Sequence, residues 1–226
     1  MTLKDQVREL RLQGKSPKEI ARALKVAPSV VAPLVREIAA ETAGTGEAEV
    51  VGCWINVGWS EGLLVDQARG WVDKEPAAGT GGMVSVLVAR RHSWDRLRVG
   101  GFLADVYCMG VKNAIGPDVI DDRFLSEFRE YFFSDYPGWQ EAPFELVQHL
   151  VLGSIDYARG LGFEPDSAFE AGADLLGTLD GDPAITFGRD GKPHYVEFPG
   201  DDPAKVLRTL RHTLTDDQFT HTTPAH

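Results

Sequence analysis

The chain has 226 residues, of which 43% are apolar, and it carries two cysteines and a net charge of -11. This length and apolar content suit one large domain with a hydrophobic core and a small second unit. Two cysteines exclude a disulfide framework, and they cannot complete a four-ligand zinc site unaided. The charged N-terminus lacks the apolar stretch of a secretory signal, and no apolar run reaches the roughly 18 residues that span a bilayer. The sequence therefore predicts a cytoplasmic protein without a membrane partner.

The charge is divided unevenly along the chain. Residues 1–40 carry eight basic and four acidic side chains, a net charge of +4, so the remainder carries -15. A basic end on an acidic body favours a polyanionic partner for that end alone. A helical bundle with a solvated charged surface would have the same composition, so charge leaves both interpretations open.

Three short helices are expected in the first forty residues. Residues 3–13 repeat leucine and valine at helical spacing. Ser16 is followed by a proline at the first helical position and then by Glu19, a capping-box pattern that starts a second helix. A third helix is expected over residues 29–38, where apolar side chains recur every three or four positions.

The segment SPKEIARALKVAPSVVAPLVREI resembles the helix-turn-helix of resolvases, sigma-factor-like regulators and many small bacterial repressors. The resemblance covers about residues 4–38 and includes the pattern E-I-A-x-x-L-x-V. In that family the second helix of the motif lies in the major groove of DNA. The resemblance implies a helix-turn-helix domain over residues 1–40, with nucleic-acid contacts from Lys15, Lys18, Lys25, Ser29 and Arg36.

The positions that would read base edges depart from the usual composition of such a helix. They are Ala27, Pro28, Ser29, Ala32 and Pro33, whereas base edges are read best by Arg, Lys, Asn and Gln. This weakens sequence-specific readout more than it weakens contact with phosphates. A motif used for protein contact or dimerisation, and a purely structural bundle, both stay open beside DNA binding.

The rest of the chain is expected to form one larger domain. Residues 41–49 are small or acidic and lack an apolar stripe, which predicts a linker. An α+β domain is expected over residues 50–214, and the polar residues 215–226 are expected to be a disordered tail. The segments DVYCMGVKN, GSIDYARGLGFEP and FGRDGKPHYV are together similar to an uncharacterised bacterial domain, a resemblance that implies a single domain and assigns no role to any residue.

Alternating apolar residues predict the strands of this domain. Strands are expected at residues 50–59 and 83–90, and the second could pair as a hairpin with a strand from Leu97. The run from Val99 to Asn113 is expected to be a buried strand that leaves the sheet at Gly110. Helices are expected at residues 63–72, 121–133, 143–160, 169–176 and 203–214, and an Asp-Gly turn at 188–191 predicts a hairpin of strands 185–187 and 194–198.

A group of basic residues lies at the turn of the first hairpin. It comprises Arg90, Arg91, His92, Arg96 and Arg98 around Trp94. Basic residues beside an aromatic ring could hold a phosphate backbone and stack a base. The favoured interpretation is a solvated turn whose arginines pair with acidic residues of the same domain.

Four residues are candidates for catalysis: Asp105, Cys108, Glu145 and His149. A thiol nucleophile at Cys108 would need a base such as His149 within hydrogen-bond reach. In a regular strand Asp105 and Cys108 face opposite sides, and a free cysteine in an apolar strand is usually a core residue. Glu145, His149 and Asp156 share a helical stripe that could bind a metal if another element added ligands, but a solvated Glu-His pair is the commoner arrangement.

The sequence indicates no metal site and no cofactor, because the glycine-rich segments do not match a phosphate-binding loop. The function expected is DNA binding by a transcriptional regulator whose C-terminal domain senses a ligand, dimerises or binds a protein. A homodimer is expected, because one short recognition helix buries too little surface for specific affinity. The alternatives are a hydrolase or nuclease with its site in the C-terminal domain, and an adaptor that binds protein or RNA.

Overall fold

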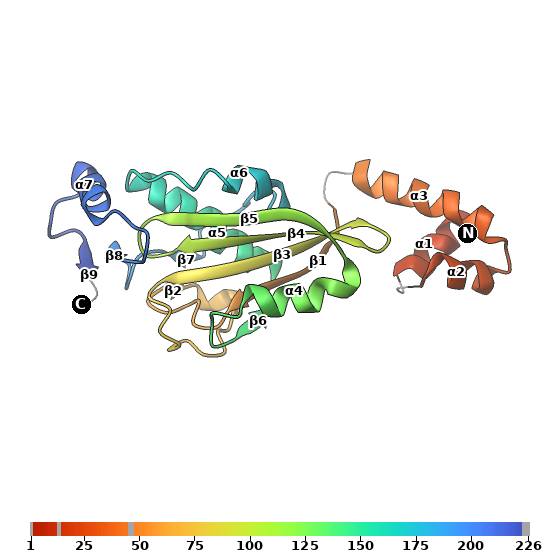
Figure 1. Ribbon diagram of the computed structural model, residues 1–226, viewed down its shortest axis with the longest axis horizontal. Helices are drawn as coiled ribbons and strands as arrows, with labels where there is room; N and C mark the ends of the chain where they lie inside the picture. Colours follow the sequence, from red (N-terminus) through yellow and green to blue (C-terminus); the bar gives the residue numbers. More distant parts are fainter. Residues whose placement is uncertain (1, 13–14, 45–47, 223–226) are drawn as a thin grey trace. The chain divides into compact units, whose positions relative to one another are not determined.

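A computed structural model describes residues 2–12, 15–44 and 48–222 of the chain (Figure 1). By its contacts the chain divides into two compact units, residues 1–49 and 50–226, called here the N-terminal unit and the body. The architecture is α+β and includes a five-stranded antiparallel sheet. No helix in the described ranges is long and apolar enough to cross a membrane.

The N-terminal unit contains α1 (Leu3–Leu12), α2 (Pro17–Leu24) and α3 (Pro28–Gly44). α2 begins as the sequence predicts, because Ser16 Oγ accepts from the Glu19 N–H at 3.3 Å and the Glu19 carboxylate accepts from the Ser16 N–H at 2.8 Å. The three helices enclose one small core of Val7, Ile20, Ala21, Val31, Val35 and Ile38.

α3 continues through residues 41–44, the first part of the segment expected to be a linker, because alanine and glutamate favour a helix even without an apolar stripe. The linker residues 45–47 lie outside the described part of the chain.

The sheet of the body has the strand order β5-β4-β3-β1-β6, and every neighbouring pair is antiparallel. Its strands are β1 (Val50–Asn56), β3 (Met83–Ser93), β4 (Arg96–Asp105), β5 (Gly110–Asp121) and β6 (Trp139–Glu141). The hairpin expected from residues 83 and 97 onward is confirmed as the pairing of β3 with β4.

The single strand expected over residues 99–113 is wrong. β4 ends at Asp105, the chain turns through residues 106–109, and β5 returns from Gly110. The turn residues Val106 and Cys108 are fully buried, so their apolar side chains look like a continuation of the strand. Gly110 has a φ of 68°, which favours glycine, and this lets the chain reverse.

Helices lie against both faces of the sheet (Figure 1). α5 (Phe144–Gly160), α6 (Phe169–Gly172) and a 3-10 turn, Ala173–Leu175, contribute to the core on one face. α4 (Leu125–Phe132), entered through a 3-10 turn at Asp122–Phe124, contributes to a smaller core on the other. Successive residues of β3 alternate between the two cores, as the pleat of a strand requires.

Two adjacent glycines of β4 let these helices approach the sheet. A Cβ on Gly100 would collide with Leu175, and a Cβ on Gly101 would collide with the ring of Phe132. The pair Gly100-Gly101 therefore serves packing on both faces.

Several elements of the body differ from expectation. The helix expected at residues 63–72 is absent from this described range, which instead forms β2 (Leu64–Val65) and a 3-10 turn, Gln67–Arg69. β2 pairs with β7 (Ile185–Thr186), so β7 does not form the expected hairpin with β8 (His194–Val196). The Asp-Gly signal gives only an isolated bridge, because both flanking strands find other partners.

The residues expected to be a disordered tail are partly ordered. After α7 (Pro203–Thr213), Phe219 is buried and β9 (Thr220–Thr222) pairs in parallel with β8. Residues 215–222 thus take part in the fold because they bury an aromatic ring and complete a ladder, which their polar composition does not reveal. Residues 223–226 lie outside the described part.

Replacing Gly101 by alanine is expected to lower the free energy of unfolding by about 1–3 kcal/mol, because the added methyl group meets the Phe132 ring. Urea denaturation measures this. Gly160→Ala is the control: a Cβ there meets nothing within 4 Å, so stability should stay unchanged or rise by up to about 1 kcal/mol. An equal loss in both variants would contradict the packing role of Gly101.

Candidate functional site

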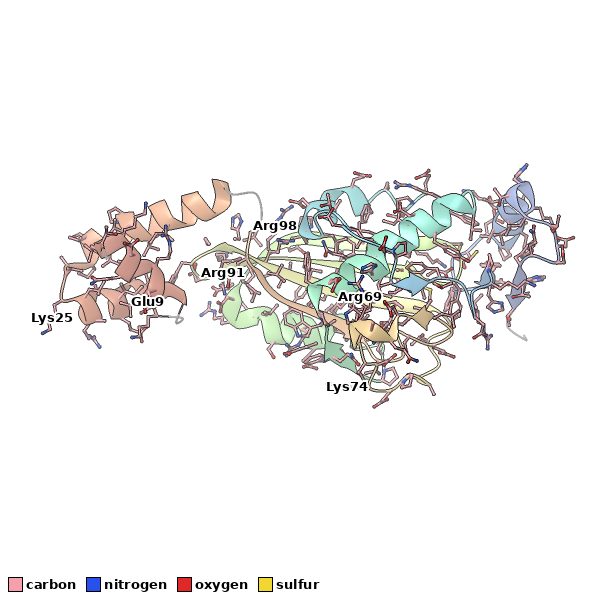
Figure 2. The ribbon with its side chains drawn as sticks, turned by 180° about the vertical axis from the view of Figure 1, so that it is seen from behind. Glu9, Lys25, Arg69, Lys74, Arg91 and Arg98 are labelled. Carbon is pink, nitrogen blue, oxygen red and sulfur yellow. The ribbon has the colours of Figure 1, made fainter. Side chains whose placement is uncertain are left out.

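The described side chains predicted to contact nucleic acid lie around α2 and the start of α3. Lys15 precedes the N-cap of α2, Lys18 lies in its first turn, and Lys25 is its C-cap (Figure 2 labels Lys25). Ser29 lies in the first turn of α3. Lys18, Lys25 and Ser29 are exposed and Lys15 is half-buried. Arg36 belongs to α3, but its side chain lies outside the described residues.

The turn between α2 and α3 has a defined geometry. Lys25 has a φ of 55°, in the left-handed region, and the Val26 N–H donates to the Ala21 carbonyl at 3.0 Å. This closes α2 at a position where glycine is the usual residue. Three residues, 25–27, connect the two helices, and the first residues of α3 are exposed.

Two acidic residues of the N-terminal unit have capping roles. The Glu19 carboxylate accepts from Ser16, and the hydrogen bonds from Ser16 lower the pKa of Glu19. Asp5 accepts from the backbone and hydroxyl of Thr2 in the same way, and these hydrogen bonds lower its pKa. Both negative charges therefore lie at helix N-termini, where the helix dipole favours them.

The basic group at the β3–β4 hairpin is engaged within the body. Arg90 is buried and its Nε donates to the Leu175 carbonyl at 2.7 Å. The remaining contacts are Arg91 with Asp122 at 2.9 Å, Arg98 with Asp174, and Arg96 with the Val119 carbonyl at 3.2 Å. Figure 2 labels Arg91 and Arg98. The pairing of Arg91 and Arg98 with acidic residues agrees with the favoured interpretation of a structural turn.

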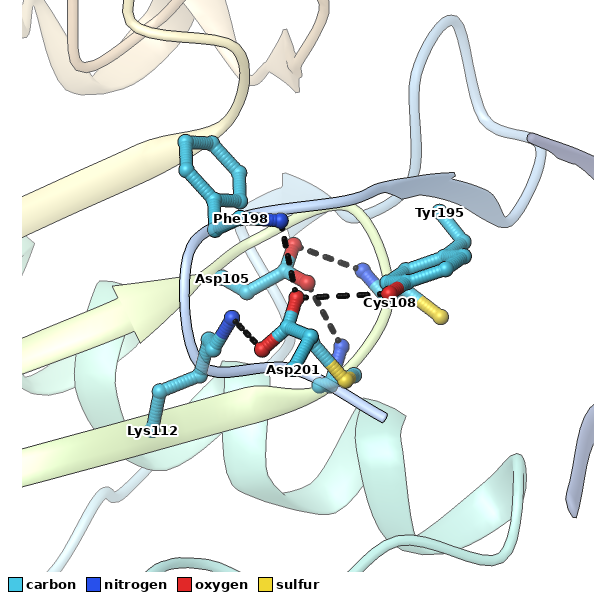
Figure 3. A network of polar contacts seen from close by, with 7 residues as sticks. Asp105, Cys108, Lys112, Tyr195, Phe198 and Asp201 are labelled. Carbon is cyan, nitrogen blue, oxygen red and sulfur yellow. Dashed lines mark hydrogen bonds and ion pairs between the residues drawn. The ribbon is translucent and has the colours of Figure 1, made fainter. Parts of the chain in front are cut away.

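Asp105 organises the turn between β4 and β5 (Figure 3). Its buried carboxylate accepts from the backbone N–H groups of Tyr107, Cys108 and Met109 at 2.9, 3.0 and 3.2 Å. Burial raises the pKa of Asp105 to about 6, although these hydrogen bonds oppose the shift. A turn, unlike the expected strand, brings the Asp105 carboxylate to the backbone of Cys108.

The Cys108 thiol is not placed as a nucleophile. It is fully buried in a cluster with Leu161, Tyr195 and Leu210. Burial raises the pKa of the thiol, which disfavours the reactive thiolate. Cys108 thus has the packing role of a small core residue.

Sequence reasoning missed the ion pair that adjoins this turn. Lys112 Nζ donates to Asp201 at 2.5 Å, and Asp201 also accepts from the Phe198 N–H at 3.0 Å and from the Tyr195 hydroxyl at 3.4 Å (Figure 3). Asp201 lies 89 positions from Lys112 in the chain, so no local pattern could identify the pair.

The other two catalytic candidates lie on α5 and have different neighbours. Glu145 forms an ion pair with Arg69. The ring of His149 is buried, and its centroid lies 5.3 Å from the centroid of the Trp71 ring. The Nε2 atom of His149 has no hydrogen-bond partner among the described residues. Burial, with Arg69 nearby, lowers the pKa of His149. Asp156 is exposed and forms an ion pair with Arg159.

The enzyme alternative requires Cys108, His149 and Glu145 to converge. Cys108 packs in a cluster with Leu161 and Tyr195, whereas the ring of His149 contacts that of Trp71 with an interplanar angle of 53°. Within the part of the chain that the structure describes, no three His, Cys, Asp or Glu side chains are placed to hold a metal ion. No protein-family model, curated protein or solved structure matches the chain.

Asp105→Asn is expected to lower the free energy of unfolding by about 1–3 kcal/mol, because an amide nitrogen cannot accept from the turn and leaves a buried N–H without a partner. Thermal and urea denaturation measure the loss, with the exposed Asp182→Asn as the control. The Asp105 carboxyl carbon, followed by NMR, is expected to titrate with a midpoint of about 6. Equal stability of both variants would contradict the role of Asp105.

His149 predicts a stability change on mild acidification. Its pKa is lowered in the folded state, so the unfolded chain binds the proton more readily and the contribution of His149 is lost as pH falls below its unfolded value of about 6.5. Urea denaturation of the wild type and of His149→Gln tests this. Below that pH the unfolding free energy of the wild type should fall relative to that of the variant. A difference that is constant with pH would contradict this.

Proposed function

We propose that the N-terminal unit is a helix-turn-helix that binds double-stranded DNA, and that the chain is a regulator whose body senses a ligand, dimerises or binds a protein. The observation that carries the proposal is the three-residue connection between α2 and α3, with the exposed start of α3 beside Lys25. In a helix-turn-helix this arrangement places the beginning of the second helix in the major groove.

The side chains around this connection favour phosphate contact over base readout. Lys18 and Lys25 are exposed cations on either end of α2. The start of α3 offers Ser29 as its polar group, beside Pro28 and the partly exposed Val30. Apolar groups there can contact thymine methyl groups, but they form no bidentate hydrogen bonds to bases. We therefore expect binding that is salt-dependent and only modestly sequence-specific.

The charge of the body supports the same division of roles. Residues 50–226 carry a net charge of -12, whereas residues 1–40 carry +4, so the body repels phosphates and the first forty residues attract them. A single short recognition helix buries little surface, so two copies on neighbouring half-sites would give the affinity that one lacks. A homodimer is accordingly part of the proposal.

Fluorescence anisotropy of the full-length protein on duplex DNA across a salt series tests the proposal. Lys18→Ala and Lys25→Gly are each expected to weaken binding and to reduce the slope of log affinity against log salt by about 1, because each removes one phosphate contact. Glycine is used at position 25 because it accepts the left-handed backbone there.

Lys74→Ala in the body is the matched control, because it removes the same charge from an exposed position outside the N-terminal unit (Figure 2). It should leave both affinity and salt slope unchanged. The proposal is wrong if the wild type shows no salt-sensitive binding, or if the Lys74 variant loses as much affinity as the Lys18 variant.

A further inference from the structure

The face of the sheet on which α4 lies is only partly covered. α4 has eight residues, and Phe132 near its end packs over Gly101. Beside it, Leu103 of β4 and Ile115 of β5 line a concavity of about 520 Å³ whose other wall includes Phe128 and Tyr131 of α4. This volume is within the range of small-molecule sites, which are concave and mostly apolar.

Large apolar side chains are exposed at this concavity. Ile115 and Tyr131 line it, and Tyr131 is 81% exposed. Phe128 and Tyr131 also line a neighbouring hollow that includes Phe124, so the apolar surface continues along α4. Contiguous exposed apolar surface marks a site of interaction more often than scattered residues do.

Two carboxylates give this apolar site a definite charge. Asp118 of β5 and Asp135, which follows α4, both line the concavity. Neither side chain is hydrogen-bonded or ion-paired to another residue in the described ranges. The arginines of this end of the sheet are engaged elsewhere: Arg91 holds Asp122, and Arg96 donates to the Val119 carbonyl. The negative charge of the site is thus not neutralised from within.

One hydroxyl group that lines the site is already paired. Ser85 lines the concavity, is buried, and lies 2.7 Å from the Tyr136 hydroxyl in a hydrogen bond. A bound molecule would therefore find its charged partners in Asp118 and Asp135 and its apolar contacts on the aromatic wall. An anion would be repelled by both carboxylates, whereas a cation would be attracted to them.

We propose that the concavity between α4 and strands β3–β5 binds a small organic cation, such as a primary amine on an apolar chain or ring. The carboxylates of Asp118 and Asp135 attract the ammonium group, and the exposed Tyr131 ring offers an aromatic surface for a cation–π contact. The apolar part of the ligand lies on Leu103 and Phe128. This binding site does not depend on DNA binding by the N-terminal unit.

The test uses the full-length protein with phenethylamine as the probe and phenethyl alcohol as its neutral counterpart. Saturation-transfer NMR and calorimetry should show saturable binding of the amine at millimolar concentration or below, about tenfold tighter than that of the alcohol. Asp118→Asn and Asp135→Asn are each expected to weaken amine binding about threefold to tenfold while leaving alcohol binding unchanged. Tyr131→Ala should weaken amine binding about threefold.

Asp182→Asn is the matched control, because it removes the same charge from an exposed position that does not line the concavity. It should leave amine binding unchanged. The proposal is overturned if amine and alcohol bind equally, if the Asp182 variant loses as much affinity as the Asp118 variant, or if the amine does not bind. If the full-length protein fails to bind DNA in the salt series, these expected results for amine binding do not change.

Discussion

The fold of the body depends on the turn that Asp105 holds between β4 and β5. One carboxylate accepts three backbone N–H groups, so a buried charge is compensated where four consecutive residues leave the sheet. The turn also contacts segments that are distant in the chain. The Val106 carbonyl accepts from the Gly188 N–H at 3.0 Å, and the Tyr107 carbonyl accepts from the His194 N–H at 3.2 Å. This turn is therefore one attachment of the C-terminal segments to the sheet, beside the ion pair of Lys112 with Asp201.

This constraint explains why the ionisable and nucleophilic residues around the turn have structural roles. Asp105 is occupied by the turn, Cys108 lies under α7, and Lys112 is paired with Asp201. Groups that are buried and mutually satisfied stabilise a fold but have no capacity left for a ligand. The surfaces that retain such capacity lie elsewhere, at the start of α3 in the basic unit and beside α4 in the acidic body. A polyanion and a cation suit these two surfaces respectively, which is the electrostatic basis of both proposals.

The candidate sites differ in how far the sequence could predict them. The capping box of Ser16 and Glu19 and the spacing of α2 and α3 are local, so the sequence located the exposed lysines correctly on these elements. The concavity beside α4 has no such pattern, because Leu103, Asp118 and Tyr131 come from three elements and meet only when β4, β5 and α4 are assembled. The same holds for His149, whose neighbour Trp71 arrives from a segment expected to be helical.

The sequence by itself determined the basic first forty residues and the acidic remainder, the start of α2, the β3–β4 hairpin and the long helix α5, because these follow from composition, capping and short-range periodicity. Only the tertiary structure decided that residues 99–113 are divided between two strands joined by a turn at 106–109, that β7 and β8 pair with β2 and β9, and that residues 219–222 are ordered. A buried turn contains apolar residues, so its sequence lacks the polar residues that usually indicate a turn. Strand partners are set by which pairings satisfy the most backbone hydrogen-bonding groups, and these depend on segments far away in the chain.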